Sequence, residues 1–134
     1  MAVLPSEQRK VGTSEDVVSI RQVVRQRAIE LGFNLVDQTK IVTAASELAR
    51  NTVQYGGGGL VTIEEVERPG RRGLRLVFED KGPGIADVQV ALRDGYTTGG
   101  GLGLGLGGAR RLANEFEIES QPGKGTVVTY VRWR

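Results

Sequence analysis

The chain has 134 residues and a formal net charge of +2, and it contains neither histidine nor cysteine. These absences exclude disulfides, thiolate nucleophiles, Ser-His-Asp catalysis, a phosphohistidine relay and zinc sites built from cysteine or histidine. Proton transfer on this chain must therefore use a carboxylate, a lysine or a tyrosine. The length favours a single domain over residues 1–134.

No apolar run approaches the roughly 18–20 residues that a membrane-spanning helix needs, and no signal-peptide core follows Met1. We therefore expect a soluble, cytoplasmic protein with no membrane partner. Charges of both signs are mixed along the chain, which argues against a dedicated nucleic-acid surface. The basic clusters at 68–72 and 132–134 are interpreted instead as a hairpin tip and a frayed terminus.

The first half of the chain predicts a strand followed by two helices. A short edge strand is expected over residues 6–11. Thr13 is predicted to cap a helix with an acidic first turn, and Gly32 to stop it. Asp37 is predicted to cap a second helix that runs to about Tyr55. Apolar positions recur at helical spacing in both helices: Val17, Ile20, Val24, Ala28 and Leu31, then Ile41, Ala45, Leu48, Thr52 and Tyr55.

The second half predicts two β-hairpins separated by helices and a glycine-rich loop. In chain order the expected segments are strands 60–67 and 73–80, helices 87–93 and about 107–114, and strands 116–120 and 126–133. This order predicts an α+β fold: a two-layer sandwich with helices packed on one face of a mixed, mostly antiparallel sheet.

The glycine-rich loop is the most unusual stretch of the sequence, because seven of the ten residues in 99–108 are glycine. Each glycine costs about 0.5–1 kcal/mol in a helix or strand relative to alanine, so this density suits a loop that approaches a ligand or moves. There are two alternatives: the segment is a buried strand with alternating leucines, or it is a linker. We favour a phosphate-cradling loop that opens a helix. It is not a Walker A motif, because no Gly-Lys-Ser/Thr follows it.

Glu47 and Asn51 form a candidate pair on the second predicted helix. They are four residues apart, so they share a face that borders the apolar stripe, whereas Arg50 points away from that stripe. A carboxylate there can orient or deprotonate a nucleophile, and a carboxamide oxygen can ligate Mg²⁺. Taken alone, the pair also fits an ordinary solvated helix face.

Asp80 opens an Asp-x-Gly-x-Gly motif at the end of an apolar strand. Gly82 and Gly84 would let a flat ligand lie against the backbone. An ionised carboxylate only accepts hydrogen bonds, so its natural small-molecule partner is an exocyclic amine such as that of adenine. A plain turn is the alternative. Thr126, at the start of the last predicted strand, is a further candidate for a ligand-binding residue.

The order Glu…Asn, Asp-x-Gly-x-Gly, Gly-x-Gly-x-Gly resembles the GHKL family of ATP-binding domains, with the Bergerat fold of gyrase, Hsp90, histidine kinases and MutL. The resemblance covers almost the whole chain. It implies that Glu47 is the general base, that Asn51 ligates Mg²⁺ and that Asp80 contacts the adenine amine. The ATP-binding residues that it implies are Asn51, Asp80, Gly82, Gly84, Thr98, Gly99, Gly101, Leu102, Gly103, Leu104, Gly105 and Thr126.

In this family the second glycine box closes over the phosphates as a lid. Residues 95–108 carry no lysine or arginine, so Mg²⁺ and backbone amides must meet the phosphate charge. We therefore expect residues 99–106 to be poorly ordered or folded away until nucleotide and Mg²⁺ bind.

A narrower resemblance is carried by residues 43–51, Thr-Ala-Ala-Ser-Glu-Leu-Ala-Arg-Asn. Among the anti-sigma-type serine/threonine kinases, this stretch resembles the stressosome switch-protein kinases of the RsbT type, as do residues 94–100 and 110–112. Anti-sigma factors proper more often carry a small or hydroxyl residue at the position of Arg50, and commonly a histidine after this box. Neither feature is present.

The resemblance implies a protein serine/threonine kinase that uses ATP and Mg²⁺. Its implied substrates are STAS-domain switch and scaffold proteins, and its implied target after release is a PP2C-type phosphatase. An anti-sigma factor kinase that sequesters a sigma factor is the alternative, and a stand-alone ATPase of the gyrase or MutL kind is a third. Self-association is left open.

Overall fold

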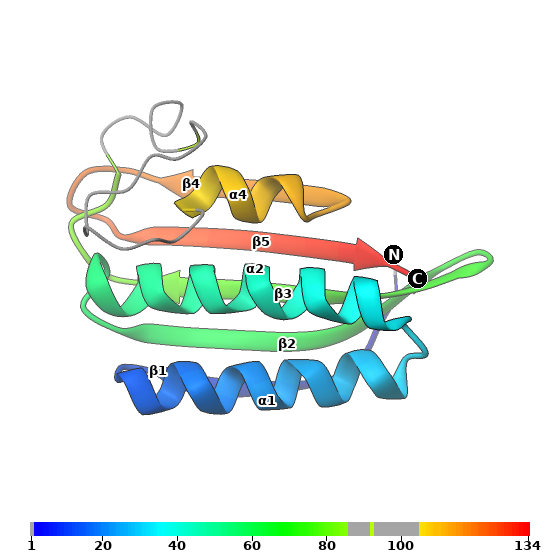
Figure 1. The fold of residues 1–134 in the computed structure, drawn as a ribbon. Helices are drawn as coiled ribbons and strands as arrows, with labels where there is room; N and C mark the ends of the chain where they lie inside the picture. Colours follow the sequence, from blue (N-terminus) through cyan, green and yellow to red (C-terminus); the bar gives the residue numbers. More distant parts are fainter. Residues whose placement is uncertain (1, 86–91, 93–104) are drawn as a thin grey trace.

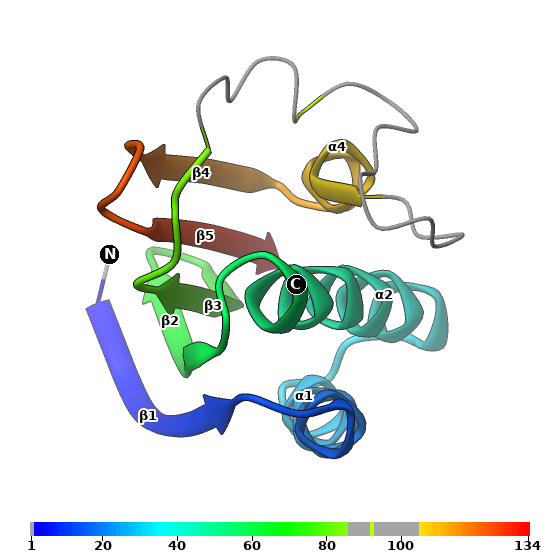
Figure 2. The same cartoon turned by 90° about the vertical axis from the view of Figure 1, so that its left-hand side faces the viewer.

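Five strands form one sheet, and the helices of the described chain cover one of its faces (Figure 1). The computed structural model describes residues 2–85, 92 and 105–134. Its two layers, seen end-on in Figure 2, confirm the predicted α+β class. In chain order the elements are β1 (Ala2–Val11), α1 (Ser14–Glu30), α2 (Leu35–Gln54), β2 (Gly59–Arg68), β3 (Arg71–Asp80), α4 (Gly105–Arg111), β4 (Glu115–Ser120) and β5 (Thr126–Trp133).

The strand order is β1-β2-β3-β5-β4, and all the pairings among these strands are antiparallel. Both predicted hairpins are present, with Arg68 opposite Arg71 in one and Ser120 opposite Thr126 in the other. Asp80 lies opposite Gly59 on one side and opposite Thr126 on the other. The register therefore brings the Asp80 motif and Thr126 together at one end of the sheet.

Thr13 caps α1, as predicted, and the structure adds that this cap is a capping box. The Thr13 hydroxyl accepts a hydrogen bond from the Asp16 backbone N–H at 3.1 Å. The Asp16 carboxylate in turn accepts from the backbone N–H groups of Gly12 and Thr13, at 2.8 and 3.0 Å. These hydrogen bonds, above all the one from Gly12, lower the pKa of Asp16. The carboxylate thus satisfies backbone donors that the first helical turn leaves without partners.

Asn34 caps α2, so the prediction of Asp37 as the cap is wrong. The Asn34 side-chain oxygen accepts from the Asp37 backbone N–H at 2.8 Å. Asp37 lies in the first turn and pairs with Arg132 of β5 at 2.9 Å. Asparagine and aspartate are about equally good caps, so the choice between them depends on which residue has extended backbone. Asn34 does, with ψ of 170°.

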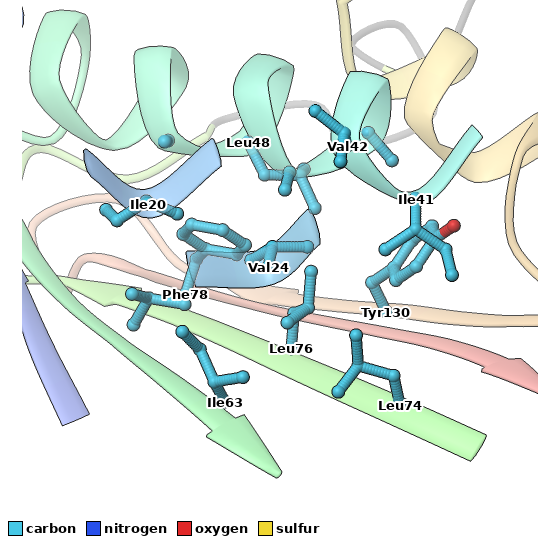
Figure 3. Close-up of a cluster of buried hydrophobic side chains, with 14 of the residues drawn as sticks. Ile20, Val24, Ile41, Val42, Leu48, Ile63, Leu74, Leu76, Phe78 and Tyr130 are labelled. Atoms are coloured by element: carbon cyan, nitrogen blue, oxygen red, sulfur yellow. The ribbon is translucent and has the colours of Figure 1, made fainter. Parts of the chain in front are cut away.

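The apolar faces of both long helices pack on the sheet (Figure 3). Each large side chain buried there contributes roughly 1.5–3 kcal/mol by leaving water. Tyr55, predicted to extend the apolar stripe of α2, is instead 39% exposed at the C-cap. The fully buried side chains include Ile20, Val24, Ile41, Leu48, Ile63, Leu74, Leu76, Phe78 and Tyr130.

The first strand and the last helix differ from their predicted bounds. β1 begins at Ala2 rather than at residue 6, because it pairs with β2 on both sides of an irregularity between Val3 and Ser6. α4 runs from Gly105 to Arg111, two residues earlier at its start than expected. It ends early because Asn114 already bonds to β5: its N–H donates to the Val131 carbonyl at 2.9 Å.

The C-terminal residues are not frayed, which corrects the interpretation of the basic cluster at 132–134. Arg132 pairs with Asp37, and Trp133 is 5% exposed. The Arg134 backbone N–H donates to the Arg72 carbonyl at 2.8 Å. Tertiary pairing thus holds a segment that looks like a loose basic tail in the sequence.

The helix predicted over 87–93 lies outside the described residues apart from Leu92. The same is true of residues 99–104, so the expectation about the order of the glycine loop concerns residues outside that range, except Gly105 and Leu106 in α4. Among residues 2–85 and 105–134, no helix is both long and apolar enough to cross a membrane.

Candidate functional site

Asp80 is the last residue of β3, and its side chain is half-buried among strand ends. Its Oδ1 atom accepts a hydrogen bond from the Gly82 backbone N–H at 2.9 Å. Within the described chain, no hydrogen bond to its Oδ2 atom is found. The carboxylate is therefore oriented by the backbone of its own motif and keeps one oxygen for a donor such as an exocyclic amine.

Glycines let three backbone segments close around Asp80. A Cβ on Gly56 would lie 2.3 Å from the Asp80 Cγ atom, and one on Gly82 would lie 2.7 Å from the Gly56 Cα atom. Gly125 has φ of +82°, and a Cβ there would lie 2.1 Å from the Asp80 carbonyl oxygen. A larger residue would clash with the Asp80 side chain at position 56 and with backbone at positions 82 and 125, so the glycines are required for the shape of the site.

Gly56 was missed by sequence reasoning, which treated it as part of a flexible turn after the second helix. Its backbone N–H donates to the Asn51 carbonyl at 3.3 Å. The same residue therefore joins the last turn of α2 to the carboxylate at the end of β3. The available signal was the run of glycines at 56–59 directly after a helix that carries Glu47 and Asn51.

Thr126 lies beside Asp80 and belongs to a hydroxyl pair. Its Oγ1 atom is 2.7 Å from the Ser120 Oγ atom, and Thr126 is 9% exposed. Ser120 also accepts from the Ile85 backbone N–H at 2.8 Å. Gly84, with φ of +78°, packs where a Cβ would lie 2.1 Å from the Gln121 carbonyl oxygen. The Asp80 motif is thus fixed to the β4–β5 turn. Ser120 contributes to this connection, and nothing in the sequence had indicated its role.

Glu47 is on α2, and its side chain is largely buried, with 7% of the residue exposed. One carboxylate oxygen pairs with Arg50, and the other accepts from the Gly105 backbone N–H at 3.3 Å. Arg50 is exposed and away from the core, as predicted, but its guanidinium turns back to Glu47 one helical turn earlier. A buried carboxylate loses hydration, and this cation offsets that loss.

Gly105 is the first residue of α4 and the only predicted glycine-box residue that the structure describes. Its contact with Glu47 places the end of the glycine loop against the predicted base. The other predicted loop residues, Thr98, Gly99, Gly101, Leu102, Gly103 and Leu104, lie outside the described residues.

Asn51 is half-buried in the last turns of α2. It follows Glu47 by one helical turn and precedes Gly56, which contacts Asp80. In the part of the chain that the structure describes, its carboxamide makes no hydrogen bond. Its side-chain oxygen is a hard donor of the kind that Mg²⁺ prefers. Among residues 2–85 and 105–134, no group of three acidic side chains gathers around a possible metal position. The donor set therefore fits an ion that takes most of its ligands from a bound phosphate and water.

The sequence profile of the histidine kinase-, DNA gyrase B-, and HSP90-like ATPases matches residues 36–134. The chain is 47% identical to the serine/threonine-protein kinase RsbT of Bacillus subtilis (strain 168) over 124 residues, which cover 92% of this chain and 93% of that protein. It is 29% identical to the anti-sigma F factor of Thermoanaerobacter sp. (strain X514) over 119 residues, or 84% of this chain and 82% of that factor.

Two solved structures have the same fold. The RsbU and RsbW domains of a Mycobacterium tuberculosis protein match with a TM-score of 0.65 and 22% identity, covering 98% of this chain and 33% of that one. The chain thus spans about a third of that larger structure. The mycobacterial sensor histidine kinase MprB matches with a TM-score of 0.56 and 20% identity, covering 95% and 97%. At 20–22% sequence identity, these two structures support the assignment of the fold alone.

Proposed function

The chain belongs to the histidine kinase-, DNA gyrase B- and HSP90-like ATPase family, and on this premise we propose that it is a Mg-ATP-dependent protein serine/threonine kinase of the RsbT type. The observation that carries the proposal is the arrangement along one helix. Glu47 and Asn51 lie one turn apart on α2, and Gly56 connects the end of that helix to Asp80. The proposed base, the proposed Mg²⁺ ligand and the proposed adenine-binding carboxylate therefore follow one another in this order.

Asp80 is the proposed anchor of the adenine ring. Its carboxylate accepts the exocyclic amine, and Gly82 and Gly84 leave room for the ring beside the backbone. Thr126 supports the same end of the site from β5. The glycine-box residues Thr98, Gly99, Gly101, Leu102, Gly103, Leu104 and Gly105 are proposed to cover the phosphates.

Asn51 and Glu47 are the proposed reaction end. Magnesium, when bound, neutralises charge on the phosphate oxygens. Asn51 supplies its side-chain oxygen to that ion. Glu47 orients a serine or threonine hydroxyl of a protein partner and accepts its proton, which is the positioning role that phosphoryl transfer requires of a protein base. Its contacts with Arg50 and Gly105 hold the carboxylate in place before the partner arrives.

The proposed partners are STAS-domain switch and scaffold proteins of a cytoplasmic stress-signalling complex, with a PP2C-type phosphatase as the target activated after release. The support is the 47% identity to a protein named serine/threonine-protein kinase RsbT. The arginine at position 50 and the absence of histidine support the same choice.

The test is phosphoryl transfer from [γ-³²P]ATP to a purified STAS-domain protein. We expect label on the STAS protein, none on the kinase itself, and loss of label when EDTA removes Mg²⁺. Asp80→Asn should abolish the label. Glu79→Gln is the matched control, because Glu79 is the exposed neighbouring carboxylate of the same strand. Transfer that survives Asp80→Asn would contradict the site, and no transfer to any STAS protein would contradict the activity.

A sigma-binding role is the second candidate, and it is favoured by the 28–31% identity to proteins named anti-sigma F factor. A pull-down that offers a sigma factor and a STAS protein together separates the two. Retention of the STAS protein alone supports the kinase of the RsbT type, and tight retention of the sigma factor supports the alternative.

A further inference from the structure

Arg50 is the cation that lies against the proposed base. Its guanidinium pairs with one carboxylate oxygen of Glu47 across one helical turn, and the Gly105 backbone N–H donates to the other oxygen at 3.3 Å. A carboxylate has about four acceptor positions on its two oxygens, so these two contacts leave room for an incoming hydroxyl. A hydroxyl that reaches Glu47 therefore meets the guanidinium of Arg50 beside it.

The reaction end of the site has few other positive charges. Residues 95–108, which include the glycine box, carry no lysine or arginine. The two arginines of α4 lie in its last turn, about 7.5–9 Å along the helix axis from Gly105. The arginines of α1 that line the same cavity as Glu47 make no ion pair with it within the described chain. Arg50 is thus the arginine in direct contact with the proposed base.

The side chain of Arg50 can change partners without unfolding the helix. It is 45% exposed, whereas the side chain of Glu47 is 9% exposed. Both residues line a cavity of about 360 Å³ between α1 and α2, so the cation lies on the side from which solvent reaches the carboxylate. An ion pair with an exposed arginine is weak, because water competes for the guanidinium. A stronger anion nearby would therefore displace Glu47.

The transferred phosphoryl group must lie close to this cation. A base and the hydroxyl that it deprotonates are about 2.6–3.2 Å apart, and the attacking oxygen starts about 3–3.5 Å from the phosphorus. The phosphorus therefore lies within about 7 Å of the Glu47 carboxylate. Rotation about the torsions of an exposed arginine side chain covers such a distance. A guanidinium binds two phosphate oxygens at once, which suits a group whose charge is spread over three equatorial oxygens.

We propose that Arg50 is a catalytic residue that leaves Glu47 during the reaction and binds the oxygens of the transferred phosphoryl group. The assignment rests on the proposed kinase function. It adds a side-chain cation to the backbone amides and the Mg²⁺ that are expected to meet the phosphate charge. Arg50 thus supplies from α2 the positive charge that the glycine box lacks.

Proton transfer to Glu47 drives the exchange of partners. The bond between the hydroxyl oxygen and the γ-phosphorus forms as the bond from that phosphorus to the β–γ bridging oxygen breaks, and ADP leaves. The hydroxyl proton passes to Glu47, which loses its negative charge and most of its attraction for Arg50. The phosphoryl oxygens stay negative throughout, so they become the stronger partner of the guanidinium. Glu47 then releases the proton to water and pairs with Arg50 again.

The first test measures, by calorimetry on the full chain, binding of Mg-ADP with tetrafluoroaluminate, an analogue of a phosphoryl group in transfer. Arg50→Ala should lower the affinity for this analogue at least about a hundredfold and leave the affinity for Mg-ADP within about twofold. Arg50→Lys should keep part of the affinity, because an ammonium retains the charge but not the planar fork. Arg72→Ala is the matched control, since Arg72 is also an exposed arginine that pairs with a carboxylate, Glu67 at 4.0 Å.

Glu47→Gln separates contact with the phosphoryl group from support of the base. If Arg50 acts only by holding Glu47, Arg50→Ala should add nothing once that carboxylate is an amide. We expect instead that Arg50→Ala weakens binding of tetrafluoroaluminate in the Glu47→Gln background about as much as it does in the wild type. The absence of a further loss in that background would overturn the proposal.

The kinetics of phosphoryl transfer distinguish this role from binding of the protein substrate. In an active chain, Arg50→Ala should lower kcat at least about a hundredfold and keep both KM values within about threefold. Added guanidinium ion should restore part of the rate of Arg50→Ala and should not raise the rate of Arg72→Ala. A raised KM for the protein substrate with an unchanged kcat would overturn the proposal in favour of a binding role.

Equal losses of tetrafluoroaluminate binding in Arg50→Ala and Arg72→Ala would also overturn the proposal, as would a wild type that binds Mg-ADP no more tightly with tetrafluoroaluminate than without it. Because this binding needs no protein substrate, a chain that shows it in an Arg50-dependent manner but transfers phosphate to no protein would refute the proposed function and leave the role of Arg50 in place. Transfer at the wild-type rate by Arg50→Ala would refute the role of Arg50 alone.

Discussion

The Asp80 end and the Glu47 end of the site are held in different ways. At the Asp80 end, backbone touches backbone: a Cβ on Gly84 or Gly125 would come within 2.1 Å of a carbonyl oxygen. At the Glu47 end, a side chain meets one exposed arginine and one amide at 3.3 Å. The first arrangement cannot change without moving the sheet, whereas the second can exchange partners inside a folded domain. This difference fits the proposed roles of Asp80 in a fixed adenine site and of Glu47 in an adjustable reaction centre.

Glu47→Gln should produce the largest effect, because it removes the proposed base and keeps its size. We expect phosphoryl transfer to fall by about 10²–10⁴-fold, measured as initial rates of ³²P transfer at saturating Mg-ATP. Glu64→Gln is the matched control, since Glu64 is 9% exposed and pairs with Arg75 at 2.9 Å on the sheet. Transfer at the wild-type rate by Glu47→Gln would show that the reaction end has been misplaced.

Gly125→Ala should produce the largest loss of stability, and Gly123→Ala in the same turn is its control. Both glycines have similar positive φ, +82° and +78°, but a Cβ on Gly123 meets nothing within 4 Å. Left-handed backbone alone costs roughly 1–2 kcal/mol, and the clash with the Asp80 carbonyl adds to it, for a total of about 3 kcal/mol. Urea unfolding measures both. Equal destabilisation would contradict the close packing at the Asp80 end.

Tyr130→Phe tests the hydrogen bond that holds the chain just after α4, whereas the contact between Gly105 and Glu47 holds the start of that helix. The Tyr130 hydroxyl donates to the Leu112 carbonyl at 2.8 Å just after that helix, and burial raises the pKa of Tyr130. Loss of this hydrogen bond should lower the free energy of unfolding by about 1 kcal/mol or less, because Arg132 still donates to the same carbonyl at 3.0 Å. Tyr55→Phe, at an exposed position, should be neutral. A loss of transfer as large as that of Glu47→Gln would mean that both ends of α4 control the reaction.

Glu7→Gln should have the smallest effect, confined to acidic pH. The hydrogen bond from Arg27 lowers the pKa of Glu7 from its ordinary value of 4.5. A lowered folded-state pKa stabilises the protein above the unfolded value, and that contribution is lost as pH falls through the folded value. The free energy of unfolding of the wild type should therefore exceed that of the variant by less than about 1 kcal/mol at pH 7. This difference in unfolding free energy should disappear below pH 4.5. Glu119→Gln is the exposed control, and a gap that widens in acid would contradict the assignment.

The sequence predicted the parts of this site that depend on local pattern. Helical spacing identified the apolar faces of α1 and α2 and placed Glu47 and Asn51 on one face. The Asp-x-Gly-x-Gly motif predicted that Asp80 stands at the end of a strand, and Asp80 is the last residue of β3. The cap at Thr13 was predictable because its hydrogen-bond partner lies within one helical turn.

The remaining parts depend on tertiary contacts that no local pattern encodes. Asn34 rather than Asp37 caps α2 because of a backbone angle fixed by the preceding turn. Gly56 and Ser120 contribute through register, which brings together segments far apart in the chain. The turn of Arg50 back to Glu47 follows from the burial of that carboxylate, which the sequence does not reveal.

The most direct test of the two-ended site is calorimetric titration of Mg-ATP into Asp80→Asn and Glu47→Gln side by side. Asp80→Asn replaces the charged acceptor of the adenine amine with a neutral amide. The affinity of this variant for Mg-ATP should therefore fall about a hundredfold. Glu47→Gln should bind Mg-ATP like the wild type, because its side chain acts on the incoming hydroxyl. Equal affinity in the two variants, or a larger loss in Glu47→Gln, would contradict the division between a binding end and a reaction end.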